Sequence, residues 1–143
     1  MRRLFVCFAL LLGLAMPCAF ADEKKAEAVV NKTGIPDVLI IPSAELSIDD
    51  LQKIVQTAVI NRGWIPKITN KKTVNCTLDV RGKHKVVVDI LLDPKKITIR
   101  YVSSENMKYD PVKKTIHRNY NNWVKNIQTD ITKQIALKGM ENK

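Results

Sequence analysis

Seven polar residues of this chain have side chains suited to holding an anion. Four of them surround the start of a predicted helix, where free backbone N–H groups and the helix dipole favour negative charge. The other three belong to predicted strands or to the turn between them, and the sequence leaves open whether they converge with the first four. The candidate binding residues are Arg81, His84, Arg100, His117, Arg118, Asn119 and Asn121. The alternative is a structural cap, in which these groups only complete the hydrogen bonding of the helix start.

No residue pattern in the chain identifies a reaction. His84 and His117 are the only histidines, and the sequence shows no acidic partner that would orient either ring. With Cys76 pointing inward, the histidines have no recognised metal-ligand spacing, no serine lies in a nucleophile elbow, and the carboxylates are scattered. We therefore expect no catalytic residue, no metal ligand and no cofactor. The alternative is a small enzyme in which His117, with Arg118 or Arg100, acts on an anionic substrate.

The elements that would position these residues belong to a two-layer α+β sandwich. Alternating apolar residues predict strands at 64–70, 74–81, 86–92 and 97–101, which form an antiparallel meander of three or four strands with one apolar face. Two amphipathic helices would cover that face, in the order (β)αββββα.

The domain boundaries follow from where the apolar patterns begin and end. Residues 22–46 are expected to be an N-terminal arm or linker with a possible short edge strand at 38–41. A single domain covers residues 47–138, and residues 139–143 form a C-terminal tail.

Both helices have recognisable ends. Ser47-Ile48-Asp49-Asp50 matches a capping box and starts the first helix, which Gly63 ends. Asn119 is the expected N-cap of the second helix, which Gly139 ends. Residues 103–118 before it are expected to be a long loop, with a short strand around 115–117 as an option. The second helix presents one packing stripe: Tyr120, Trp123, Val124, Ile127, Ile131 and Ile135.

Residues 1–21 predict an export signal. Arg2 and Arg3 precede an apolar stretch of signal-peptide length, and Ala19-Phe20-Ala21 provides a cleavage site between Ala21 and Asp22. The stretch is too short for a transmembrane helix, so we expect no transmembrane segment in the mature chain. The expected location is the periplasm.

A lipid anchor at Cys18 is the alternative to soluble release, although Pro17 fits poorly before a lipidated cysteine. Cleavage after Ala21 would remove both Cys7 and Cys18. Cys76 would then be the one cysteine left, so no intramolecular disulfide could form. We expect Cys76 to be a buried thiol that packs as a small apolar side chain.

The chain is strongly basic, with 24 Lys and Arg against 14 Asp and Glu and a net charge of +10. Loss of Arg2 and Arg3 on cleavage would leave +8. Outside the cytoplasm, such a surface favours an envelope protein, an anionic lipid or an acidic polymer as partner, and makes nucleic acid an unlikely one. The alternative is that paired lysines mark solvated turns. The sequence does not indicate the oligomeric state.

Several short motifs are spread over residues 47–135. They are Gly63-Trp64, Arg81 and His84, Ile99-Arg100-Tyr101, Ser104, Asn106 and Ile116-His117-x-Asn119-Tyr120-Asn121-x-Trp123-Val124. In these motifs the chain resembles a family of small exported bacterial proteins and lipoproteins of uncharacterised function. The resemblance implies an envelope location and a compact α+β domain, and brings no reaction or ligand.

Together these patterns favour a non-catalytic exported domain that binds an envelope component through its basic surface. A membrane-surface or lipid-anchored protein is the remaining alternative.

Overall fold

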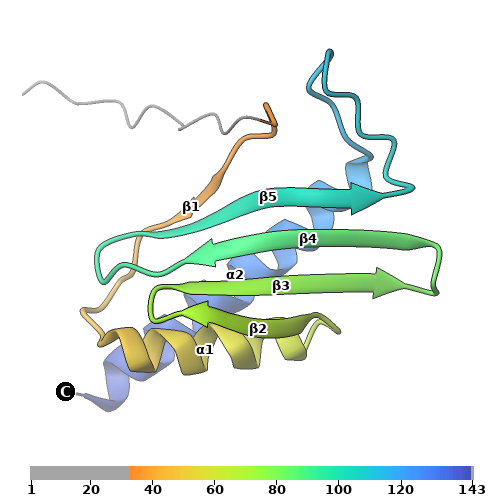
Figure 1. The fold of residues 1–143 in the computed structure, drawn as a ribbon. Helices are drawn as coiled ribbons and strands as arrows, with labels where there is room; N and C mark the ends of the chain where they lie inside the picture. Colours follow the sequence, from red (N-terminus) through yellow and green to blue (C-terminus); the bar gives the residue numbers. More distant parts are fainter. Residues whose placement is uncertain (1–32, 143) are drawn as a thin grey trace, which may run out of the picture.

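The computed structural model describes residues 33–142 of the chain (Figure 1). Its elements, in chain order, are β1 (Val38–Ile40), α1 (Ile48–Ile60), β2 (Ile65–Asn70), β3 (Thr73–Val80), β4 (His84–Leu91), β5 (Ile97–Glu105) and α2 (Arg118–Glu141). The predicted export signal with its cleavage site at Ala21 and Asp22, Cys18, and residues 22–32 of the arm lie outside the described residues.

The five strands form one antiparallel sheet in the spatial order β1-β5-β4-β3-β2. The two helices pack against each other and against the apolar face of the sheet, and α2 crosses behind it in Figure 1. This arrangement confirms the predicted α+β sandwich. The optional edge strand is present as β1, which pairs with β5.

The first helix begins as its capping box predicts. The Ser47 hydroxyl accepts a hydrogen bond from the Asp50 backbone N–H at 3.1 Å and donates one to the Asp50 carboxylate at 2.8 Å. After the helix, Gly63 takes a left-handed φ of +79°, which a residue without a Cβ adopts without steric cost. The turn that Gly63 makes allows Trp64 to enter the core directly before β2.

The inward residues of the central strands alternate as predicted, except at one point in β5. Val87 pairs with Ser103 and Val88 with Tyr101, so Val102 is an extra residue that forms a β-bulge. Because of the bulge, Ser104 lies on the same face of the sheet as Tyr101, and the two hydroxyl oxygens are 2.9 Å apart. The prediction of a loop from residue 103 was therefore wrong, because the strand continues to Glu105 once the bulge is included.

The second helix differs from the prediction at both ends. Its N-cap is His117 and not Asn119, because the His117 ring nitrogen Nδ1 accepts a hydrogen bond from the Asn119 backbone N–H at 3.2 Å. The helix also continues through Gly139 to Glu141, so the predicted tail is helical at its start. A Cβ built on Gly139 would lie 2.6 Å from the Cβ of Ala44. The glycine therefore permits close packing and does not end the helix.

The core contains one thiol and an aromatic cluster. Cys76 is buried, as predicted, and burial raises the pKa of its thiol to about 12. A thiol that stays protonated at neutral pH is a poor nucleophile. Tyr101 packs against Tyr109 and Tyr120, with ring centroids 5.2 and 5.5 Å apart.

Candidate functional site

One end of the sheet brings together most of the predicted site residues. This basic end consists of the β3–β4 turn (residues 81–83), His84, the loop 106–117 between β5 and α2, and the first turn of α2. The Asn106 side-chain amide donates to the Lys83 carbonyl at 2.7 Å, and the His84 ring donates from Nδ1 to the Asn106 carbonyl at 2.9 Å. The His117 backbone N–H donates to the Met107 carbonyl at 2.7 Å. Asn106 and Met107 thus connect the hairpin to the start of α2.

The basic end carries more positive than negative side chains. Its exposed cations are Arg81, Lys83, Lys108, Lys113, Lys114 and Arg118, and none of these six forms an ion pair within residues 33–142. The nearby carboxylates have other partners. Asp79 and Asp110 accept hydrogen bonds from backbone N–H groups of their own turns, and Glu105 lies 3.9 Å from the ammonium of Lys85. The six cations are therefore available to an anionic partner.

Backbone strain is concentrated in the same place. The non-glycine residues with left-handed φ in the described part of the chain are Arg81 (58°), Asn106 (56°), Lys108 (50°) and Lys114 (55°). All four belong to the basic end. Such conformations each cost on the order of 1 kcal/mol and persist where surrounding contacts hold them, often at functional sites.

The loop 106–117 is held by specific contacts. Asp110 and Thr115 exchange two backbone hydrogen bonds, of 2.9 and 3.2 Å. These bonds form an isolated bridge, and residues 115–117 do not form the predicted short strand. The Tyr109 hydroxyl donates to the Thr33 carbonyl at 2.7 Å. The loop therefore presents its lysines from a defined backbone, which in Figure 1 leaves the end of β5 and rises past the edge of that strand, away from the β3–β4 turn.

Six of the seven predicted binding residues lie at the basic end, namely Arg81, His84, His117, Arg118, Asn119 and Asn121. Arg100 does not. It lies five residues before the end of β5, which is about 16 Å along an extended strand. Its guanidinium bonds the buried carboxylate of Asp37, with the closest contact at 3.1 Å. Arg100 therefore holds β5 to the segment before β1.

Each of the two histidine rings forms a hydrogen bond with a backbone group of the basic end. Because Nδ1 of His117 accepts a bond, its neutral ring carries the proton on Nε2, whereas His84 uses Nδ1 as the donor. Neither ring contacts a carboxylate among residues 33–142, and no group of three or more His, Cys, Asp or Glu in that range could hold a metal ion. The arrangement suits hydrogen bonding and charge recognition.

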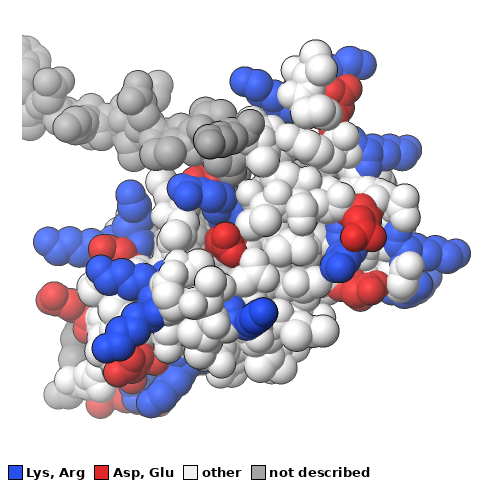
Figure 2. Space-filling view, viewed as in Figure 1, with Lys and Arg blue, Asp and Glu red and all other residues white. Residues whose placement is uncertain are grey.

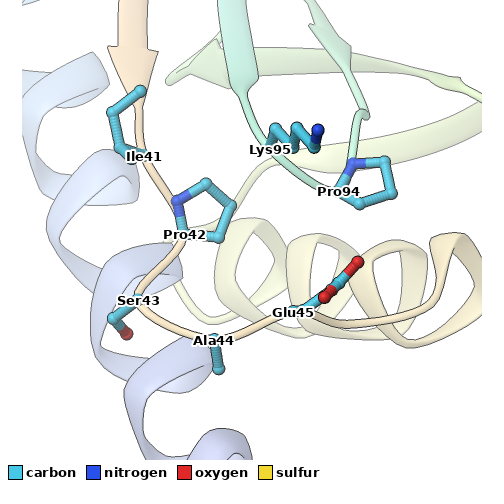
Figure 3. A pocket seen from close by; sticks show the side chains of 7 residues that line it. All are labelled: Ile41, Pro42, Ser43, Ala44, Glu45, Pro94 and Lys95. Carbon is cyan, nitrogen blue, oxygen red and sulfur yellow. The ribbon is translucent and has the colours of Figure 1, made fainter.

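A hollow of about 350 Å³ lies at the opposite end of the molecule (Figure 3). It separates the β1–α1 connection from the β4–β5 turn, and its lining residues are Ile41, Pro42, Ser43, Ala44, Glu45, Pro94 and Lys95. None of the predicted site residues lines it. Glu45 and Lys95 are its two charged residues, so it has no excess of either charge.

A smaller pocket of about 150 Å³ adjoins the basic end and was not predicted. It is lined by Arg62, Trp64, Leu78, Val80, Trp123 and Asn126. Sequence reasoning assigned Trp123 to the core, and the residue is half-buried. The spacing of Asn119, Trp123, Asn126 and Asp130 places them on one helix face beside the buried stripe, and this is the signal that could have indicated the pocket.

A comparison with protein-family models, curated proteins and solved structures found no match to this chain. The resemblance to small exported bacterial proteins stays a prediction. Within residues 33–142, neither helix is long and apolar enough to cross a membrane.

Proposed function

We propose that this protein is an exported, non-catalytic binding domain that holds an anionic component of the cell envelope at its basic end. The observation that carries the proposal is the group of six exposed cations without ion-pair partners in the described chain. The predicted export signal supports the location in the cell envelope. The positive net charge of the chain supports a negatively charged partner.

The expected strength of binding follows from the number of charges. A Lys or Arg close to an anionic surface contributes about 1 kcal/mol, so the six cations together contribute on the order of 6 kcal/mol, which is comparable with the lower estimates of the cost of association. Salt screens such exposed charges over about 8 Å at physiological ionic strength. Binding should therefore be strongest at low salt and fall steeply as salt is added.

The proposal is tested with the full-length chain, expressed and purified, and inorganic polyphosphate as the anionic probe. Lys108→Glu, Lys113→Glu and Lys114→Glu together should weaken binding at least tenfold, as measured by titration calorimetry. The matched control reverses three exposed lysines of the opposite end, Lys71, Lys72 and Lys95, with the same change of net charge.

The control triple should bind within about twofold of the wild type if the basic end is the site. Equal losses in both triples would mean that only net charge matters, and the proposal would be wrong. A second arm uses vesicles containing phosphatidylglycerol, because anionic lipid is the competing partner. Vesicle binding stronger than polyphosphate binding at equal charge concentration would favour a membrane-surface protein instead.

A further inference from the structure

Both tryptophans of the chain line the pocket of about 150 Å³ beside the basic end. Val80, at the end of β3, lines the pocket and directly precedes Arg81. Trp123 follows Arg118 by about 7.5 Å along the axis of α2, at 1.5 Å per residue. A chain-like ligand that runs from Arg118 along α2 would therefore pass the mouth of this pocket.

The pocket presents hydrogen-bond donors that the protein leaves available. Neither indole N–H donates to an acceptor within residues 33–142, and neither is among the buried polar atoms there that lack a partner. Trp64 is only 3% exposed, so the half-buried Trp123 is the indole that the pocket mainly presents to a ligand. The exposed amide of Asn126 has no protein partner in that range either.

The guanidinium of Arg62 is fixed at the rim of the same pocket. It donates to the Asp130 carboxylate from Nε at 2.6 Å and from a terminal nitrogen at 3.0 Å. These bonds lower the pKa of the Asp130 carboxyl and hold the planar group in one orientation. The remaining N–H groups of Arg62 add to the donors of the site.

A donor-rich pocket beside one half-buried indole fits an oxygen-rich ring better than an apolar side chain. An apolar occupant would leave donors without partners, at about 1–3 kcal/mol for each one that it buries. A sugar ring offers a C–H face to the half-buried indole of Trp123 and hydroxyl oxygens to the donors. The volume is below the roughly 300 Å³ of typical small-ligand sites, so it suits one ring of a longer chain.

We propose that the pocket between Trp64 and Trp123 is a saccharide subsite, which takes one ring of an acidic polysaccharide whose other charged groups lie on the basic end. This inference rests on the proposed function, because the basic end supplies the recognition of charge. The contacts in the pocket would allow the protein to bind a sugar chain more tightly than another polyanion of equal charge.

The test compares two probes on the full-length chain: oligogalacturonate, whose rings each carry a carboxylate, and inorganic polyphosphate of matched total charge. Tryptophan emission reports directly on the pocket, since it contains both indoles. Oligogalacturonate should change the emission and polyphosphate should not. Asn126→Ala should weaken oligogalacturonate binding about five- to tenfold, as the loss of one hydrogen bond to a ligand implies, and leave polyphosphate binding unchanged.

Asn122→Ala is the matched control, because Asn122 is an exposed asparagine of α2 that neither lines the pocket nor belongs to the predicted binding residues. It should leave both affinities within twofold. If both probes bind but Asn126→Ala has no effect, or polyphosphate changes the emission equally, the subsite is refuted and the proposed function stands. If neither probe binds at low salt, the proposed function itself is refuted.

Discussion

At the scale of single residues, the structure separates arginines that hold the fold together from cations that face solvent. The side chain of Asp37 is only 2% exposed, and a buried carboxylate is costly unless it is paired. Arg100 supplies a partner at 3.1 Å. Arg62 pairs with Asp130 at 2.6 Å on the helical side, where the carboxylate is 25% exposed. Arg81 and Arg118 form no ion pair within the described residues, which is why the proposed site includes them and excludes Arg100.

Arg100→Ala should destabilise the protein without weakening its binding. Removing hydrogen bonds to a charged group costs about 1.5–3 kcal/mol, and urea unfolding would measure this as a lower free energy of unfolding. Polyphosphate affinity should stay within twofold of the wild type, since Arg100 lies outside the basic end. A loss of affinity with unchanged stability would show instead that Arg100 belongs to the binding site.

At the scale of secondary-structure elements, sequence patterns correctly predicted the helix cap and the strand alternation, because both depend on residues that are close together in the chain. The capping box at Ser47 and the apolar alternation of β3 and β4 formed as expected, because hydrogen bonds and burial at those positions follow a fixed period. The bulge at Val102 breaks that period, so the end of β5 could not be read from alternation. The pocket escaped prediction because its lining comes from separate elements that only the fold brings together.

Gly139 is a case where local and tertiary effects oppose each other. Helix propensity alone would make Gly139→Ala stabilising by about 1 kcal/mol. The added Cβ would lie 2.6 Å from that of Ala44, so either the loop or the helix must move. We expect a net destabilisation of roughly 1–3 kcal/mol in urea unfolding, the usual cost of overpacking.

The double variant Ala44→Gly, Gly139→Ala tests the cause of that loss. Removing the Ala44 methyl group makes room for the new one, so much of the lost stability should return. If Gly139→Ala alone stabilises the protein, the helix end is not packed against Ala44, and the glycine has no role in close approach.

At the scale of the whole molecule, charged side chains are distributed unevenly over the open face of the sheet. The face seen in Figure 2 has a largely uncharged middle, whereas Lys and Arg side chains gather towards its ends. On this face, charges near the middle are engaged: the Asn75 amide donates to Asp89 at 2.7 Å, and Arg100 bonds Asp37. The edge strand β2 carries Pro66 and Lys67, residues that discourage pairing with another strand. The basic end differs from the opposite end, with Lys71, Lys72, Lys95 and Lys96, in carrying two exposed arginines, Arg81 and Arg118, beside its four lysines.

The central claim is that an anionic partner binds at the basic end, and the most direct test is a map of amide chemical shifts by NMR as polyphosphate is added. The account predicts that shifts concentrate at residues 81–84 and 106–118. The turns at 71–72 and 95–96, which are equally rich in lysine, should change little. Shifts of equal size at those turns, or confined to the open face of the sheet, would contradict the account.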